Sequence, residues 1–235
     1  MGAAANSKSP WAVPEARGRD RDREVKREAV LRTAARLFNE KGFHATSLDD
    51  VAERLEVTKP TLYYYVASKD EILFECVRIG LQMLHDGIEQ SRLAGGAAID
   101  QLVACMRTYA RIVTMDFGMC LIRTGEEPLL PDSRKKLRHL KAGIDLEFRR
   151  LIELGIAEGA LAPCDPKLAA FTLAGALSWI GRWYSADGTY TADEVADHCI
   201  ALLLNGALLR DSPATAVSAT PRRRAPPGRV KSARA

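Results

Sequence analysis

The apolar residues of this chain recur every three to four positions from about residue 22 to residue 210, and this spacing constrains the fold more than any other feature. Such a period places apolar side chains on one face of a helix. No stretch alternates strictly between apolar and polar residues, and Asp187-Gly188, which resembles a hairpin turn, is flanked by helical patterns. We therefore predict an all-α fold.

Capping residues and glycines set the expected helix ends. Gly42 should end the first helix in the left-handed conformation, and Ser68-x-x-Glu71 and Thr191-x-x-Glu194 have the pattern of capping boxes. Two short helices should open at Thr46 or Ser47 and at Thr58. The other expected helices span about 22–41, from Ser68 onward, 98–116, 119–124, 131–158, 165–184 and 191–210.

Both ends of the chain lack an apolar period, so we expect a disordered N-terminal arm, residues 1–21, and a disordered tail, residues 212–235. The tail is basic, because residues 213–235 hold six arginines and lysines and no acidic residue. Without these six cations the formal net charge of +4 becomes −2. A uniformly cationic surface for nucleic acid is therefore excluded, whereas a small basic patch is not.

The sequence shows no feature of a membrane or exported protein. Its longest apolar run, residues 199–204, is far shorter than a membrane span, and the N-terminus has no apolar segment of a signal peptide. The five cysteines are odd in number and form no Cys-x-x-Cys motif, as in proteins that keep reduced thiols. We expect a cytoplasmic protein with no membrane partner.

A helix-turn-helix pattern spans about residues 47–66, where two short capped helices are joined by Glu56 and Val57. In such a unit the second helix enters the major groove of DNA with its N-terminal residues against the bases. A lysine there can donate to guanine, and a tyrosine hydroxyl can reach a phosphate. Short capped helices are also common without DNA, so the pattern alone leaves both interpretations open. The residues available for DNA are Lys59, Pro60, Thr61, Tyr63 and Tyr64, followed by Lys69 in the next helix.

Three motifs within residues 24–84 carry a resemblance to a known family. They are Lys41-Gly42-Phe43-x-x-Thr46-Ser47, Val57-Thr58-Lys59-Pro60-Thr61-Leu62-Tyr63-Tyr64-Tyr65-Val66 and Ser68-Lys69-x-x-Ile72-Leu73. The stretch resembles the DNA-binding domain of the TetR family of bacterial repressors. The positions that correspond to the family's DNA contacts are Ser47, Lys59, Thr61, Tyr63, Tyr64 and Lys69.

The resemblance implies an all-helical homodimer. Its N-terminal three-helix domains, residues 24–84, would bind the half-sites of a palindromic operator in double-stranded DNA. Its larger helical domain, residues 85–211, would hold a small-molecule pocket and the dimer interface. Repression of transcription is the family's usual mode of action.

Glu56 departs from the family's pattern, which usually has glycine at this position of the turn. If the turn keeps its shape, Glu56 takes a positive φ, which costs free energy for a residue with a side chain. Its charge also lies near the DNA backbone, where it would moderate the affinity. Tyr65 is a second departure, since histidine or phenylalanine is commoner there.

The second half of the chain carries a weaker resemblance. Glu126-Glu127-Pro128-Leu129-Leu130-Pro131 and Trp179-x-x-x-Trp183-Tyr184 are similar to segments of TetR-family regulators of fatty-acid, steroid and related acyl-CoA degradation. This similarity implies an acyl-CoA or another small lipophilic effector. The two tryptophans also fit a packing seam, and Arg123 and His139 also fit a solvated surface. The residues expected near the effector are Met106, Arg123, His139, Phe148, Trp179 and Trp183.

The family's dimers pair their last two helices as a four-helix bundle. Apolar residues of the two corresponding helices fit such an interface. They are Leu173, Leu177, Val195, Leu202 and Leu203.

Competing functions have less support in the sequence. No Gly-x-Ser-x-Gly, P-loop, dinucleotide-binding or His-Glu-x-x-His motif is present, so an all-helical enzyme is a distant alternative. The four histidines show no metal-ligand spacing, and we expect neither a metal nor a cofactor. The nearer alternative is a repressor that responds to a drug-like or other lipophilic compound, since it would share the DNA-binding half.

Overall fold

A computed structural model describes residues 19–206, and every regular element in this part of the chain is a helix. The all-α prediction is therefore confirmed. The expected basic tail, and the expected arm up to residue 18, lie outside the described residues, whereas residues 19–21 already belong to the first helix. The helices are α1 (Arg19–Lys41), α2 (Leu48–Arg54), α3 (Lys59–Tyr63), α4 (Lys69–Ala94), α5 (Ala98–Val113), α6 (Asp116–Thr124), α7 (Pro131–Ala157), α8 (Pro166–Trp183) and α9 (Ala192–Asn205).

Side chains fix the start of α2. Ser47 caps the helix and Asp50 completes the capping box, with the Ser47 amide donating to the Asp50 carboxylate at 2.7 Å. Thr46, the other candidate cap, is buried instead, and its hydroxyl donates to the carbonyls of Leu37 and Gly42 at 3.2 and 2.9 Å. Thr46 therefore ties the loop to the end of α1 and leaves the cap to Ser47.

The expected capping box at α4 is only half formed. Ser68 accepts from the Glu71 amide at 3.1 Å, as a cap should. The Glu71 carboxylate, however, accepts from the amide of Ala67 at 2.6 Å and from Arg27 of α1 at 3.1 Å. Glu71 is drawn towards α1 and so contributes to helix packing. The box predicted at Thr191 and Glu194 is complete and opens α9.

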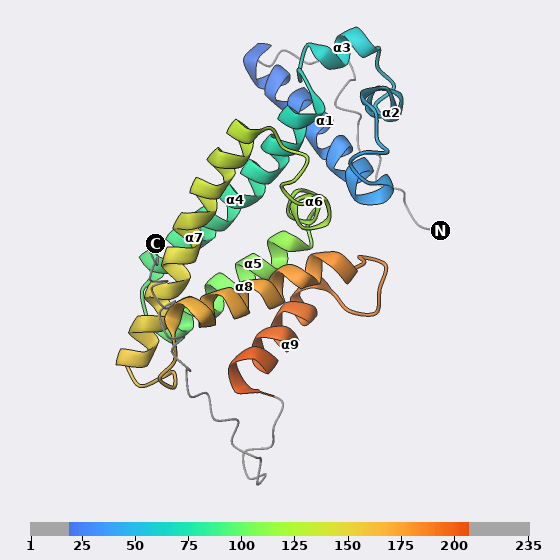
Figure 1. The fold of residues 1–235 in the computed structure, drawn as a ribbon. Coiled ribbons are helices and arrows are strands. Elements are labelled where there is room, and N and C mark those ends of the chain that lie inside the picture. Colours follow the sequence, from blue (N-terminus) through green and yellow to red (C-terminus); the bar gives the residue numbers. More distant parts are fainter. Residues whose placement is uncertain (1–18, 207–235) are drawn as a thin grey trace, which may run out of the picture.

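The first three helices pack around one small core and against the start of α4 (Figure 1). Arg27 of α1 lies between Glu71 and Glu75 of α4 and adds two half-buried ion pairs to that contact. The side chains that close this core are Val30, Ala34, Leu37, Phe38, Val51, Ala52, Leu62 and Val66. The short helices α2 and α3 thus contribute Val51, Ala52 and Leu62 to a core that they share with α1.

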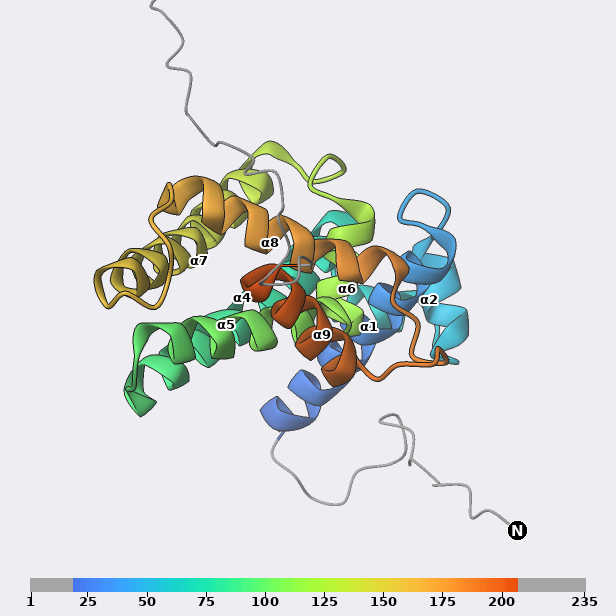
Figure 2. The ribbon, with the colours of Figure 1, turned by 90° about the horizontal axis from the view of Figure 1, so that it is seen from below.

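The larger unit is built on the same α4, which runs from the small unit along α5, α6 and α7 (Figure 1). Helix α8 lies across α5 and α7, and α9 packs against α5 beside α8 (Figure 2). Ion pairs from Arg107 to Asp197 and from Arg111 to Asp193, at 2.6 and 2.5 Å, hold α9 on α5. No helix in residues 19–206 is long and apolar enough to cross a membrane.

The structure moves several predicted boundaries, and α1 begins and α5 ends three residues earlier than expected, at Arg19 and Val113. Helix α6 begins at Asp116, three residues earlier than expected, and at Gly118 it lies close against the end of α5. A Cβ on Gly118 would lie 2.0 Å from the carbonyl oxygen of Ile112, so only glycine fits there. Helix α9 ends at Asn205 and not near Arg210, since Gly206 has a φ of +75°.

Glu56 has a φ of +56°, and no other non-glycine residue in the described part of the chain has a positive φ. The conformation predicted from the missing glycine is therefore confirmed. The turn holds together through backbone bonds, with the amide of Val57 donating to the carbonyl of Ala52 at 3.0 Å. Left-handed backbone costs a residue with a Cβ about 1–2 kcal/mol.

Replacing this residue by glycine should stabilise the protein. Glu56→Gly removes the left-handed cost but adds about 0.5–1 kcal/mol of unfolded-state freedom. We expect the free energy of unfolding to rise by roughly 0.5–1 kcal/mol, measured by thermal and urea unfolding. The matched variant Glu53→Gly, in the last turn of α2, should lower it by up to about 1 kcal/mol. Equal destabilisation by both substitutions would contradict this account of the turn.

Candidate DNA-binding surface and ligand pocket

The residues predicted to contact DNA gather at the α2–α3 turn, but they differ in how free they are. Lys59, Pro60, Tyr63 and Tyr64 are exposed on or beside α3, where a duplex can reach them. The Tyr63 and Tyr64 side chains keep 48% and 64% of their surface exposed, which is unusual for tyrosine in a folded unit. Thr61 is half-buried, with its hydroxyl 2.8 Å from that of the capping residue Thr58.

Lys59 is held by a carboxylate of the same protein. Its ammonium lies 2.8 Å from Asp49 of α2, and this hydrogen bond and the nearby charge raise the pKa of Lys59. Both side chains are more than half exposed, so water screens the pair and it contributes little to stability. A phosphate or a guanine edge can therefore replace Asp49 at small cost.

Ser47 and Lys69 are partly engaged inside the protein. Ser47 caps α2 and also contacts the Asp50 carboxylate, whose pKa the Ser47 hydroxyl and Lys41 hold well below its usual range. Lys69 is half-buried, and its ammonium donates to the Phe43 carbonyl at 2.6 Å while lying 4.4 Å from the centre of the Phe43 ring. Burial lowers the pKa of Lys69. These two residues shape the loops around the DNA-binding surface and offer DNA fewer free donors than Lys59.

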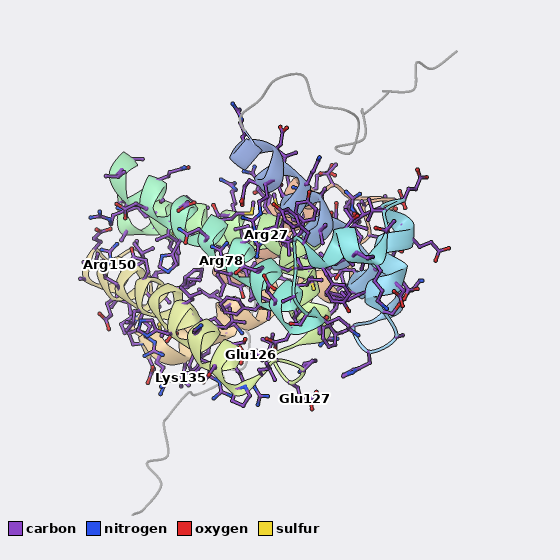
Figure 3. The ribbon with its side chains drawn as sticks, turned by 90° about the horizontal axis from the view of Figure 1, so that it is seen from above. Arg27, Arg78, Glu126, Glu127, Lys135 and Arg150 are labelled. Carbon is purple, nitrogen blue, oxygen red and sulfur yellow. The ribbon has the colours of Figure 1, made fainter. Side chains whose placement is uncertain are left out.

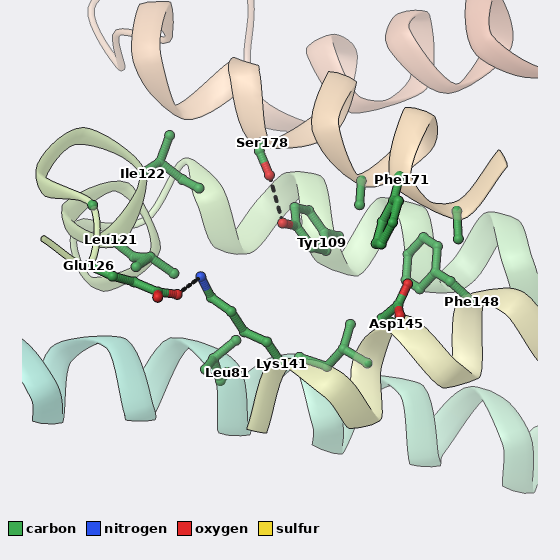
Figure 4. Close-up of a pocket in the computed structure, with 14 residues that line it drawn as sticks. Leu81, Tyr109, Leu121, Ile122, Glu126, Lys141, Asp145, Phe148, Phe171 and Ser178 are labelled. Carbon is green, nitrogen blue, oxygen red and sulfur yellow. Dashed lines mark hydrogen bonds and ion pairs between the residues drawn. The ribbon is translucent and has the colours of Figure 1, made fainter. Parts of the chain in front are cut away.

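A cavity of about 540 Å³ lies between the helices of the larger unit (Figure 4). Its size falls within the range of small-molecule sites, roughly 300–1,000 Å³. Aliphatic and aromatic side chains form most of its wall. The lining residues are Leu81 of α4, Tyr109 of α5, Leu121 and Ile122 of α6, Gly125, Glu126, Lys141, Ile144, Asp145 and Phe148 of α7 and the loop before it, and Ala170, Phe171, Ala174 and Ser178 of α8.

Three polar pairs interrupt this apolar wall. The hydroxyls of Tyr109 and Ser178 lie 2.7 Å apart and satisfy each other, and burial raises the pKa of Tyr109, which keeps it neutral. Glu126 and Lys141 form an ion pair at 2.5 Å at one end of the cavity (Figure 4). Asp145 also lines the cavity and is paired with Arg149 one turn further along α7. The pocket is therefore suited to a ligand that is mostly apolar with a few polar groups.

Of the residues expected near the effector, Phe148 lines this cavity. Met106 is fully buried in the core and is not part of the wall, and His139 is exposed on α7 beside a separate surface hollow. Trp179 and Trp183 point away from the cavity, with 64% and 51% of their surface exposed. The prediction that the two tryptophans lie beside the ligand is therefore wrong for this cavity. Ser178 takes the cavity-facing position on α8, and Trp179, as the next residue, points about 100° away.

Arg123 was also expected near the ligand, but the structure gives it three main-chain partners. Its guanidinium donates to the carbonyls of Gly181 and Tyr184 at 3.0 and 3.2 Å, at the end of α8. It also reaches the carbonyl of Asn39 in α1 at 3.4 Å. Arg123 of α6 therefore connects the DNA-binding unit to the larger unit, which is a structural role.

Asp70 makes a second connection between the two units. It lies in the first turn of α4 and accepts from the Leu130 amide at 2.6 Å and from the Ser133 hydroxyl at 2.9 Å. Both donors belong to the segment that follows Glu126, a lining residue of the pocket. A change at that end of the pocket therefore has a short route to the start of α4 and to Lys69.

The residues predicted for a dimer interface divide in two. Leu177 and Val195 are buried, and Leu173 is nearly so, because they face α5 and α7 inside the protomer. Leu203 is half-buried, whereas Leu202 is 56% exposed. The prediction that Leu173, Leu177 and Val195 lie in a dimer interface is therefore wrong, because a partner subunit cannot reach their buried side chains. Residues on the outer faces of α8 and α9 are available instead, namely Leu168, Thr172, Gly175, Ala176, Trp179, Trp183, Ala201 and Leu202.

Most residues that line the pocket were not predicted from the sequence. Its residues come from α4, α5, α6, α7 and α8, and no local motif joins them. The only local signals were polar residues within apolar faces, such as Tyr109 in α5 and Ser178 in α8. The identity of their partners depends on helix crossings, which residue spacing does not give.

Comparisons with known proteins agree with this geometry. The family model described as bacterial regulatory proteins, tetR family, matches residues 30–76, and the model of the tetracyclin repressor-like C-terminal domain matches residues 95–207. The regulator RutR of Escherichia coli K12 is 30% identical over 203 residues, covering 85% of this chain and 88% of RutR.

Two solved structures are also similar. PfmR from Thermus thermophilus, a TetR family transcriptional regulator, has a TM-score of 0.70 and 31% identity over 77% of this chain and 99% of its own. AibR in complex with isovaleryl coenzyme A and operator DNA has a TM-score of 0.67 and 25% identity, over 76% of this chain and 98% of AibR.

Loss of the exposed side chains of α3 should abolish specific DNA binding. Each good base or phosphate contact is worth about ten- to a hundredfold in affinity, and a dimer loses it twice. We therefore predict that Lys59→Ala and Tyr63→Ala weaken binding to the DNA upstream of the protein's own gene at least a hundredfold in mobility-shift assays. Lys167→Ala, an equal loss on α8, should have no effect. Unchanged affinity of both α3 variants would rule out α3 as the recognition helix.

Proposed function

Because the chain belongs to the TetR family of bacterial transcriptional regulators, we propose that it represses transcription from a palindromic operator until a lipophilic, anionic ligand of the acyl-CoA type binds its pocket. The family binds operator DNA and small-molecule effectors, and its members are regulators and not enzymes. We infer that this protein acts in the cytoplasm, where the operator lies.

One observation carries the proposal of the ligand class. The pocket is an apolar cavity of about 540 Å³ with a lysine, Lys141, at its rim. An acyl chain suits the aliphatic wall, since each buried methylene contributes about 0.8 kcal/mol. The phosphates of coenzyme A suit a cationic rim. AibR, which has been solved with isovaleryl coenzyme A and operator DNA, supports this choice of ligand by its similarity.

Release of DNA requires the ligand to favour one conformation over another. Two recognition helices must lie about 34 Å apart to enter successive major grooves on one face of the duplex. A ligand shifts such an equilibrium only through its different affinity for the two states, and a hundredfold loss of operator affinity needs about 2.7 kcal/mol. A few methylenes buried in one state alone supply this amount. The contacts of Asp70 and Arg123 give the change a path to α4 and α1.

The alternative effector, a drug-like lipophilic compound, is a real competitor because two carboxylates line the pocket. A cationic drug would need Glu126 or Asp145 as its counter-ion. Both already have a cation of the protein beside them, Lys141 and Arg149 respectively. A cationic drug would have to displace both Lys141 and Arg138 from Glu126, whereas an anion has to displace only Glu126 and then gains both cations, which favours an anionic ligand.

A homodimer is part of the same proposal. The outer faces of α8 and α9 carry large apolar side chains in contact with water, including Leu168, Trp179 and Leu202. Such patches are typical of protein interfaces. A Cβ added to Gly175, between Leu168 and Trp179, would meet nothing within 4 Å, which leaves room for a partner helix to approach closely. Pairing of these faces between two copies would set the spacing of the two recognition helices.

A charged side chain in this face should separate the subunits. Trp179→Lys and Leu202→Lys each bury an unpaired charge if the outer faces of α8 and α9 meet, so we expect the dimer dissociation constant to rise at least tenfold. Analytical ultracentrifugation measures it. Leu146→Lys is the control, since Leu146 is equally exposed, at 62%, on α7. A dimer that tolerates both interface substitutions must use another surface.

The effector is tested by titrating acyl-CoA esters of increasing length against the protein on a fluorescent operator duplex. Each added methylene should increase the releasing potency up to about fourfold until the cavity is full, with release at micromolar concentration. Fluorescence anisotropy follows the dissociation. If no chain length releases the DNA while a lipophilic cation does, the protein senses the drug-like class instead.

A further inference from the structure

Two basic side chains and one carboxylate meet at the mouth of the pocket, and the carboxylate pairs with both cations. Glu126 accepts from the Lys141 ammonium at 2.5 Å and lies 3.5 Å from the Arg138 guanidinium. Arg138 and Lys141 are three positions apart on α7, so their side chains project to the same side of that helix. Glu126 belongs to the loop between α6 and α7 and approaches them from outside the helix.

Glu126 and Lys141 lie at the boundary between the cavity and water, and Arg138 lies outside the cavity wall, in a separate surface hollow of α7. Glu126 and Lys141 both line the cavity, next to Leu121 and Ile144. The Arg138 side chain is 69% exposed, Lys141 39% and Glu126 only 21%. Burial alone would raise the pKa of Glu126, but Lys141 and Arg138 lower it overall, and the carboxylate stays ionised at neutral pH. The least exposed member of the group is thus a permanent anion facing the pocket.

We propose that Arg138 and Lys141 form the subsite for the anionic group of the effector, and that Glu126 occupies this subsite until the effector displaces it. The inference rests on the proposed function and adds the residues that select an anion. The ligand class is an aliphatic chain that ends in a carboxylate or in a phosphate-bearing group. A free fatty acid and an acyl-CoA are two sources of this chemistry.

The arrangement of charges supports replacement of the Glu126 carboxylate by the ligand anion, and not binding of the ligand beside Glu126. A ligand anion that entered with Glu126 in place would meet a like charge in a partly desolvated site, which is costly. With Glu126 displaced, the same two cations pair with the ligand, and for a singly charged carboxylate the net charge at the mouth is unchanged. The other carboxylate of the cavity, Asp145, pairs with Arg149 and forms no ion pair with Lys141 among the described residues.

Displacement of Glu126 also has a structural consequence. The loop that carries Glu126 continues to Leu130 and Ser133, which donate to Asp70 in the first turn of α4. Movement of Glu126 therefore pulls on a segment anchored to the helix that follows the DNA-binding turn. The exchange of anions provides a direct link between ligand binding and the DNA-binding unit.

Two neighbouring residues provide matched controls. Glu127 follows Glu126 in sequence but is exposed, at the outer edge of the molecule, and Lys135 is an exposed lysine on the same helix as Lys141 (Figure 3). Within the described part of the chain neither makes an ion pair. Substitutions at these positions change the net charge by the same amount without removing a group of the Glu126, Arg138 and Lys141 ion pairs.

The test is isothermal titration of the full chain with octanoyl-CoA, octanoate and the neutral octanol. Glu126→Gln should increase the affinity for the anionic probe about tenfold and change that for octanol less than twofold. Lys141→Gln should weaken binding of the anionic probe about tenfold and again spare octanol. Glu127→Gln and Lys135→Gln should alter every affinity less than twofold. Strong binding of octanoyl-CoA alone identifies a phosphate as the bound group, and equal binding of octanoate identifies a carboxylate.

Different results distinguish failure of the proposed subsite from failure of the proposed ligand class. If octanoyl-CoA or octanoate binds but Glu126→Gln and Glu127→Gln behave alike, the subsite is overturned while the proposed ligand class stands. A similar rise for octanol in Glu126→Gln also overturns the subsite, since the gain would then come from cavity shape. If none of the three probes binds to any variant, both the subsite and the acyl class are overturned. Circular dichroism of each variant checks that it is folded.

Discussion

The continuous apolar face of α4 is the constraint on which the rest of the structure depends. Helix α4 runs from Lys69 to Ala94 without a break and contacts α1 at one end and α5, α6 and α7 along its length. Its buried residues close the core of the DNA-binding unit and then form part of the core around the pocket. They are Ile72, Leu73, Cys76, Val77, Gly80, Leu81, Leu84 and Ile88. Because protein cores are close-packed, we propose that a shift of α4 at the pocket is transmitted to its first turn.

The same electrostatic arrangement occurs at both binding surfaces. Lys59 at the DNA-binding surface is paired with Asp49, and Lys141 at the pocket is paired with Glu126. In each case a carboxylate of the protein occupies the place that we assign to an acceptor group of the ligand. This group is a DNA phosphate or base edge in the first case and the effector's anionic group in the second. Internal carboxylates of this kind lower the affinity for unspecific anions, because every incoming anion must replace one.

How far the sequence predicts this structure depends on whether the signal is local. Caps, turns and the helix-turn-helix follow from neighbouring residues, and even the positive φ of Glu56 could be predicted from a single missing glycine. The pocket and the outer face of α8 could not. Helix α8 has apolar residues on nearly every side, so its sequence does not tell Ser178, which lines the cavity, from Trp179, which faces water. The position of Arg123 could not be predicted either, because its partners are main-chain carbonyls distant in sequence.

The central claim is that the pocket and the DNA-binding surface are thermodynamically coupled through α4. Linkage requires the coupling to be reciprocal, so operator DNA must weaken effector binding by the same factor as the effector weakens operator binding. The most direct measurement is the affinity for octanoyl-CoA of the free protein and of the protein saturated with its operator duplex. The account predicts an affinity lower by about a hundredfold on the operator. Equal affinities in the two states would show that the pocket does not control DNA binding and would contradict it.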